Sequence, residues 1–328
     1  MAEFEFNTGA IKRICRDGEK NTLTAYHYTS PNALLSIIKD GFIRFSDIEY
    51  MNDKSETVYA VKVLLDFLDN HPGEYLFTRD VVSALIGQQS YADIQNLKTT
   101  KVEFQEFTGF EAQKNRSFLF CMSTKADSLN MWNYYVQNGH YEGYALGLNI
   151  YELLKTFDTP SDKEMDSFMV YHGKVVYAKD AQFDAMKRIV DSIEGMRNVA
   201  INKIHAFAAL KLRYKLESEG LFIKHPEFIS EQEYRIVVHI ADSRIPHSEE
   251  EAKKYFGENN KQMTEDFCVK NGLIVPFLKV KIPTTCVSKI LVSPILEFSL
   301  AEKAVAELLS VKGFKAATVK PSKIPIRF

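Results

Sequence analysis

The stretch Tyr26-His27-Tyr28-Thr29-Ser30 ends a β-prone run, and Pro31 follows it at a position that favours the first turn of a helix. A helix N-terminus offers backbone N–H groups and the positive end of the helix dipole to an anion. An imidazole and several hydroxyls at the same place could bind a sugar. The structural alternative is that Ser30 caps the helix and His27 is a half-buried strand residue.

A second group follows the apolar run 117–123, which has the length of a strand. Ser123 ends this run, where a short side chain can face a cleft. Asp127 is placed to cap a helix that carries Trp132 and Tyr135. These aromatic side chains could stack on a flat ring such as nicotinamide or adenine, or they could form core.

A third group is the charged segment 224–235, which runs into an apolar strand. Side chains alternate between the two faces of a strand, which predicts that Glu231, Glu233 and Arg235 share one face. A carboxylate there could bind a ribose hydroxyl, stabilise an oxocarbenium-like centre or act as general base. Lys224 and Arg235 add two cations to this segment. The structural alternative is a salt bridge between one of the acids and Arg235.

The elements that would position these groups alternate along the chain. We predict strands at 22–27, 42–46, 117–123, 144–149, 168–178, 233–240, 273–282 and 288–293. Helices are predicted after Ser30 up to Gly41, from a capping box at Asp53 and Glu56 to about 70, over most of 79–112 and 181–217, and at 299–309. The pattern indicates a single α+β domain over 1–328, with 241–272 as a candidate exposed insertion.

Composition excludes several classes of protein. The 328 residues hold 41 basic and 43 acidic side chains, so no net field favours nucleic acid or an anionic membrane. Four dispersed cysteines argue against a zinc ribbon or a disulfide framework, and scattered histidines argue against a metal site. The absence of a targeting segment and of a run of about 20 apolar residues leads us to expect a cytoplasmic protein with no membrane contact.

Five ordered motifs carry a resemblance to a known family. They are HYTSPNALLSIIKDGFIRFS, MND followed by Glu56, CMS with MWNYY, EQEYR, and SKIPIR. In this order they resemble the bacterial domain-of-unknown-function family 2971, from about Leu23 to Arg327. That family name implies no activity.

The opening motif is also similar to the first motif of ADP-ribosyltransferase-fold proteins, including DarT-like DNA-modifying toxins and RNA 2′-phosphotransferases. This resemblance implies a mixed, split and twisted β-sheet surrounded by helices, NAD as substrate, and a role as a toxin or in phage defence. It also implies roles for individual residues. His27 would bind ribose, with support from Tyr28, Thr29 and Ser30, and Ser123 with Tyr135 or Trp132 would flank the nicotinamide. Glu233 would be the catalytic residue, with Glu231 as its competitor. Arg235 and Lys224 would position the diphosphate.

Two other functions stay open. The chain could be a non-catalytic ligand- or protein-binding module on the same fold. It could also be a phosphate-ester or nucleotide-processing enzyme that holds phosphates with Arg44, Lys224 and Arg235. The ADP-ribosyl acceptor, whether protein, nucleic acid, small molecule or water, and the oligomeric state are left undetermined by the sequence.

Overall fold

The computed structural model describes residues 23–51, 56–87, 91–99, 101–107, 115–136, 141–157, 168–199, 203–256, 263–270 and 272–325. Their contacts form two compact units. Unit 1 draws on 1–47, 118–173 and 230–328, and unit 2 on 48–117 and 174–229. The prediction of one domain over 1–328 stays a prediction, because it concerns cooperative folding and not contacts alone.

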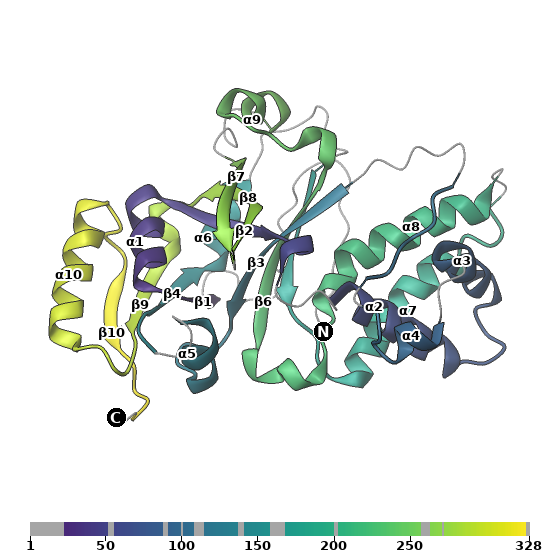
Figure 1. Cartoon of the computed structure of the whole chain (residues 1–328), viewed down its shortest axis with the longest axis horizontal. Coiled ribbons are helices and arrows are strands. Elements are labelled where there is room, and N and C mark those ends of the chain that lie inside the picture. The colour runs from purple at the N-terminus through teal and green to yellow at the C-terminus, as the bar shows by residue number, and fades with distance from the viewer. Residues whose placement is uncertain are drawn as a thin grey trace. The chain divides into compact units, whose positions relative to one another are not determined.

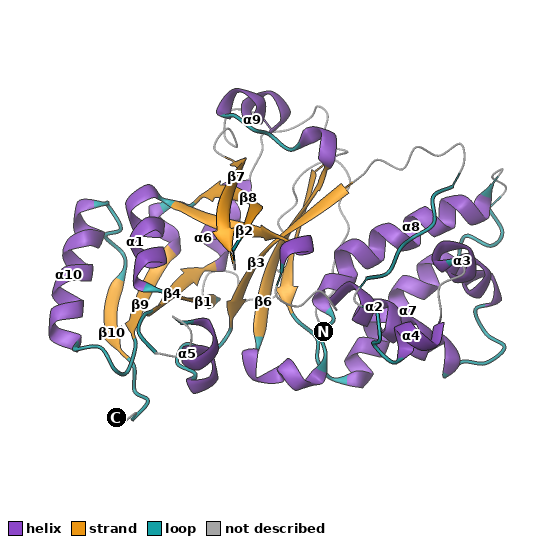
Figure 2. Ribbon diagram, viewed as in Figure 1, coloured by secondary structure: helices purple, strands orange, loops and turns teal. Residues whose placement is uncertain are grey.

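Unit 1 is built on a ten-stranded sheet, drawn in orange in Figure 2. Its main path runs β10-β9-β4-β1-β3-β2-β8-β7, and β6 pairs with both β3 and β5. The pairs along this path are antiparallel except β10 with β9, which are parallel. The strands are β1 (Thr24–Thr29), β2 (Phe42–Asp47), β3 (Asn115–Ser123), β4 (Tyr144–Asn149), β5 (Phe168–Lys174), β6 (Glu233–Ala241), β7 (Met263–Lys270), β8 (Leu273–Lys281), β9 (Val287–Val292) and β10 (Thr318–Pro321).

The first strand, helix and strand form as the sequence predicts. Helix α1 (Pro31–Asp40) begins where the Ser30 side chain accepts a hydrogen bond from the Ala33 amide, at 3.3 Å. It buries Leu34, Ile37 and Ile38, and it ends at a glycine whose φ of 71° lies in the left-handed region. Gly41 therefore lets the chain turn directly into β2.

Four further helices belong to unit 1: α5 (Leu129–Tyr135), α6 (Ile150–Leu154), α9 (Glu249–Phe256) and α10 (Phe298–Val311). Figure 1 shows α10 beside α1, β9 and β10, and these elements share contacts. Apolar side chains from the sheet and from α1, α6, α9 and α10 form one buried cluster. The prediction of an α+β fold with a β-sheet surrounded by helices is confirmed, and the sheet is large and mostly antiparallel.

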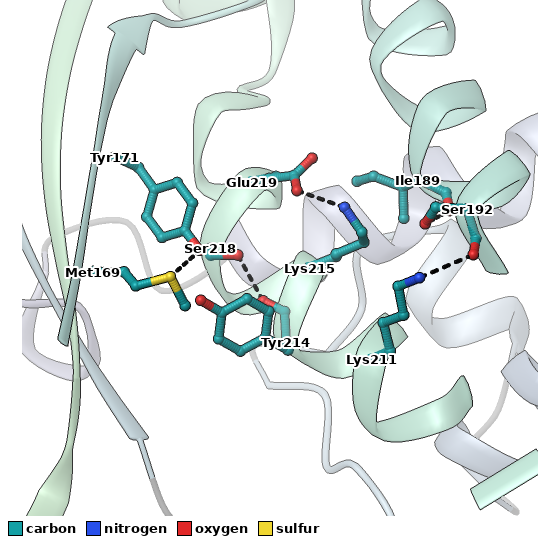
Figure 3. A network of polar contacts seen from close by, with 9 residues as sticks. All are labelled: Met169, Tyr171, Ile189, Ser192, Lys211, Tyr214, Lys215, Ser218 and Glu219. Carbon is teal, nitrogen blue, oxygen red and sulfur yellow. Dashed lines mark hydrogen bonds and ion pairs between the residues drawn. The ribbon is translucent and has the colours of Figure 1, made fainter. Parts of the chain in front are cut away.

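Unit 2 is helical, with α2 (Glu56–Asp69), α3 (Leu76–Ile86), α4 (Tyr91–Gln95), α7 (Lys179–Glu194) and α8 (Ile204–Ser218). These helices share a second buried cluster, to which α2 contributes Val58, Val61, Leu65 and Leu68. The proposed cap Asp53 lies outside the described residues. At the end of α8, Lys215 pairs with Glu219 at 2.7 Å and Ser218 donates to the Tyr214 carbonyl, as Figure 3 shows.

Two of the helical predictions need correction. Among the described residues of the stretch 79–112, helix extends to Ile86 and over 91–95; Gly87 and Leu97 have positive φ values, and residues 101–107 take no regular structure. The stretch 181–217 consists of two helices, α7 and α8, separated by a turn after Glu194.

The segment 241–272 contains α9 and the paired strand β7, and it contributes buried residues such as Ala252 and Met263.

Of the helices in the described part of the chain, none is both long and apolar enough to cross a membrane.

Candidate functional site

The residues of the first motif have structural roles at the end of β1. Ser30 is the N-cap of α1, and Thr29 is buried. The Thr29 carbonyl lies so close to Gly143 that a Cβ built on the glycine would stand 2.4 Å from the carbonyl oxygen. The hydroxyl of Ser30 is thus engaged by its own helix, as the structural alternative predicts.

His27 is half-buried, between β1 and β3. Its Nδ1 lies 3.1 Å from the carbonyl oxygen of Cys121, and its ring packs against Phe120 at a centroid distance of 4.8 Å. Burial lowers the pKa of His27, and the hydrogen bond to the carbonyl opposes this only in part. The ring is therefore neutral at pH 7, with its proton on Nδ1, and Nε2 is left as an acceptor.

Tyr28 and Trp132 belong to a small buried cluster between β1 and α5. Their rings meet edge to face at 4.8 Å, and the Tyr28 hydroxyl donates to the carbonyl of Lys125 and accepts from the Ser128 amide. The fully buried Trp132 donates its indole N–H to Asp127 at 2.7 Å. Trp132 is core in this structure, as the structural alternative predicts.

The prediction that Asp127 caps α5 is wrong. The N-cap residue is Ser128, and Asp127 instead accepts three hydrogen bonds. Besides the Trp132 indole, its donors are the Ser322 hydroxyl at 2.7 Å and the Lys323 amide at 2.6 Å. Asp127 therefore fastens the C-terminal tail to α5. The only sequence signal for this role was the SKIPIR segment, which the family resemblance included.

Ser123 connects β3 to the segment that precedes β6. It is fully buried and donates its hydroxyl to the carbonyl of Glu231 at 2.7 Å. The next residue, Thr124, donates its amide to the carbonyl of Gln232 at 2.8 Å. Gln232 has a φ of 43°, a left-handed conformation that is uncommon for a residue with a side chain. Ser123 and Thr124 thus hold a strained turn at the foot of β6.

This turn directs Glu231 toward Tyr135. Glu231 ends a 3₁₀ turn, Pro226–Glu231, and the Tyr135 hydroxyl donates to its Oε1 at 2.6 Å. The Tyr135 side chain is 42% exposed, while Glu231 is buried. Burial of the hydroxyl, and then the negative charge of Glu231, raise the pKa of Tyr135 well above its usual range. The phenol therefore stays protonated at neutral pH and acts as a donor.

Glu233 and Arg235 form a buried ion pair on β6. The Arg235 Nε lies 2.9 Å and its Nη2 2.5 Å from the same carboxylate oxygen of Glu233. Both residues are almost inaccessible to solvent. This is the salt bridge that the structural alternative predicted. The period-two prediction is correct for Glu233 and Arg235, but it does not extend to Glu231, because Gln232 and the 3₁₀ turn interrupt the strand.

The remaining candidates lie apart from this group or belong to unit 2. Lys224, in unit 2, is buried and places its ammonium 4.6 Å from the centre of the Phe228 ring. Arg44, on β2 in unit 1, is exposed and stacks over Phe277 at 4.8 Å. Among the described residues, no three His, Cys, Asp or Glu side chains form a group that could hold a metal ion.

The structure thus brings two of the predicted groups together in unit 1. Tyr135 from α5 and Glu231 from the foot of β6 share a hydrogen bond, and the charge of Glu233 is close enough to raise the pKa of Tyr135 further. In the sequence these residues belong to two separate groups. The strained Gln232, which separates the two acids, was not recognised, because no composition signal marks a left-handed glutamine.

Comparison with known proteins adds a family match over part of the chain. Residues 131–236 match the model of a family described as "Protein of unknown function (DUF2971)". The matched segment contains Tyr135, Glu231 and the Glu233–Arg235 pair. No curated protein and no solved structure matches the chain. The resemblance to domain-of-unknown-function family 2971 is therefore supported over this segment.

Proposed function

We propose that unit 1 acts on NAD as an ADP-ribosyltransferase or NAD glycohydrolase, with the Glu231 carboxylate as the catalytic group. The observation that carries this proposal is the 2.6 Å hydrogen bond between the Tyr135 hydroxyl and Glu231. It joins a partly exposed aromatic ring to a carboxylate, and these are the two groups that a nicotinamide riboside needs on either side of its glycosidic bond.

The chemistry assigns a task to each group. As the bond between C1′ and the nicotinamide nitrogen breaks, its electron pair leaves with nicotinamide and the ribosyl centre becomes cationic. The Glu231 carboxylate would stabilise this charge and accept the proton of the attacking hydroxyl or water. The Tyr135 hydroxyl, a donor at neutral pH, would orient the carboxylate. The ring face of Tyr135 would stack on the nicotinamide.

We assign the acid to Glu231 and not to Glu233 because Arg235 already holds the latter. Two N–H donors of one guanidinium contact a single Glu233 oxygen in a buried setting. A carboxylate in such a pair is a weak nucleophile or base. Protonation would remove the charge of Glu233 and leave the buried Arg235 without a charge partner. Glu233 would instead contribute a fixed negative charge near the ribose. The ADP-ribosyltransferase type of the sheet, NAD as substrate and a toxin or defence role are all part of this proposal.

A second candidate is a non-catalytic binding module. It is favoured by the closed Glu233–Arg235 pair and by the protein hydrogen bonds that engage His27, Ser30 and Ser123. In this case the Tyr135 ring and Glu231 would still contact a ligand, but no bond would break.

The test is nicotinamide release from NAD by the purified chain, with and without cell lysate as a source of acceptor. We expect Glu231→Gln to lower the rate by about 100-fold or more, the effect typical of losing a general base. Glu227→Gln removes the same charge from an exposed position four residues away and should leave the rate unchanged.

Calorimetric titration with NAD separates the two candidates. Binding without release would favour the module. Neither binding nor release would contradict both.

A further inference from the structure

The end of the β7–β8 hairpin exposes apolar side chains beside an open strand edge. Among the described strands, β7 is the last on its side of the sheet, with β8 as its partner. Phe267 and Val269 lie two residues apart on one face of β7, and Val269 pairs with Ile274 of β8. The three side chains are 58%, 76% and 75% exposed. Edge strands are commonly protected by charge, proline or a covering element, so an apolar edge suggests pairing with another strand.

Within the described part of the chain, two residues of this edge, Phe267 and Val269, can direct their backbone groups to another strand. The Glu265 amide donates to the carbonyl of Pro246 at 2.7 Å, away from β8. By the alternation of an antiparallel ladder, Phe267 and Val269 also direct their backbone groups outward. Helix α9 shares the buried cluster with Met263, so the start of the strand is occupied. The Asp266 side chain, next to Phe267, accepts a hydrogen bond from the Phe267 amide at 2.8 Å.

We propose that β7 pairs antiparallel with β7 of a second copy of this chain, with Cys268 at the two-fold axis. In this register Phe267 lies opposite Val269 of the partner subunit, so each outward residue bonds to an outward residue. A register centred on Phe267 would require backbone hydrogen bonds from Glu265, whose amide already donates to Pro246. A register centred on Val269 would require backbone hydrogen bonds from Asn271, which follows the end of β7.

The side chains favour the same register. Asp266 lies opposite Lys270 of the partner subunit, and Lys270 opposite Asp266 of the partner subunit, which gives two opposite-charge pairs across the axis. On the other face, Phe267 and Val269 of both copies join Ile274 in one apolar strip. On pairing, the Phe267 amide gives up its hydrogen bond to Asp266 and bonds to the backbone of Val269 of the partner subunit. The Asp266 carboxylate then pairs with the ammonium group of Lys270 of the partner subunit.

Charge reversal tests the register in the full-length chain. By sedimentation equilibrium in reducing buffer we expect a dimer, and we expect Asp266→Lys or Lys270→Asp alone to weaken it by about tenfold, since like charges would then face each other. The double reversal restores opposite charges and should restore the dimer. Glu302→Lys makes the same change of net charge as Asp266→Lys at an exposed position on α10 and should have no effect.

Oxidation gives a second measurement that needs no charge variant. The register places the two Cys268 residues at a non-hydrogen-bonded pair, where Cα atoms stand about 4.5 Å apart, within the range of a disulfide. Diamide would take two electrons and two protons from the two thiols, and it would be reduced to its hydrazine. A covalent dimer that Cys268→Ser abolishes supports the register. A monomer in both measurements, or a dimer that withstands the single reversals, overturns the proposal.

Discussion

At the scale of single residues, the two acids at the foot of β6 differ in what holds them. Glu231 accepts a hydrogen bond from the hydroxyl of the partly exposed Tyr135, while two donors of the buried Arg235 guanidinium hold Glu233. A buried guanidinium opposes protonation of the carboxylate that it holds, so Glu233 is poorly suited to take a proton during a reaction. This contrast is why the proposed chemistry is assigned to Glu231.

The Glu233–Arg235 pair should matter more to stability than to any reaction. We expect Arg235→Met to lower the free energy of unfolding by about 3–5 kcal/mol, because it leaves a buried carboxylate without its charge partner. Urea unfolding followed by circular dichroism would measure this. The double variant Glu233→Gln/Arg235→Met should cost clearly less than the sum of its single variants. Additive costs would show that the two side chains do not stabilise each other.

His239 should make the protein less stable in acid. Burial lowers the pKa of His239 to about 4, whereas an unfolded histidine titrates near 6.5. Between these values the unfolded state binds more protons, so stability is complete above pH 6.5 and falls as the pH drops toward 4. At about 1.4 kcal/mol per pKa unit, the loss attributable to His239 is about 3 kcal/mol.

Urea unfolding at a series of pH values would measure this loss. We expect His239→Gln to reduce the pH dependence between 6.5 and 4. Burial also lowers the pKa of His27, so part of the pH dependence should remain in this variant. His205→Gln, at an exposed position on α8, is the matched control. An unchanged slope in His239→Gln would mean that this histidine is protonated without cost in the folded state.

The sequence predicted the kinds of residues at the site better than their roles. Ser30 was identified with both a cap and a ligand role, and the local pattern of serine followed by proline could not exclude either. The pairing of Tyr135 with Glu231 joins positions 96 residues apart, so no local pattern could predict it. The family resemblance selected both residues but not their contact.

At the scale of elements, strands and capped helices were predicted well where the sequence contains residues that typically begin or end an element. Ser30, Pro31 and Gly41 mark both ends of α1, and the structure uses all three. Predictions failed where helical periodicity continued across a break made by backbone conformation. Leu97 has a φ of 52° and Lys203 one of 64°, and neither residue type indicates a break in advance. β6 pairs with both β3 and β5, and all of its residues are buried.

The C-terminal tail should determine how well α5 is held. Asp127 is the common acceptor for Trp132, Ser322 and the Lys323 amide, and Ile324 packs on the same small cluster. We expect Asp127→Ala to cost about 1–3 kcal/mol, since a buried indole N–H loses its partner. Because Trp132 is the only tryptophan, its fluorescence reports on this cluster directly.

The expected result for Asp127→Ala is emission at longer wavelength and faster quenching by acrylamide, as water reaches the indole. Ser322→Ala removes one donor but leaves the bond to Trp132, so its emission should stay close to that of the unchanged chain. If both variants keep the original spectrum, the tail does not hold α5 in place.

At the scale of the whole molecule, the chain passes between the two units four times. The boundaries at 117 and 173 fall inside β3 and β5, so two strands of the sheet continue into segments assigned to unit 2. Composition and periodicity could not reveal this division, because each unit is assembled from separate segments and neither has a linker. The family match at 131–236 also spans parts of both units.

This interleaving leads us to expect one cooperative unfolding transition, in agreement with the predicted single domain. A strand that continues across a boundary cannot lose one end without weakening its own ladder. Leu146 is fully buried in the cluster of unit 1 and Leu212 in that of unit 2, so alanine at either position should cost about 2–5 kcal/mol. In differential scanning calorimetry both variants should lower the same transition, whereas Leu300→Ala, exposed on α10, should leave it within about 0.5 kcal/mol. Two transitions, each lowered by only one of the buried substitutions, would mean that the units unfold independently and that the chain has two domains.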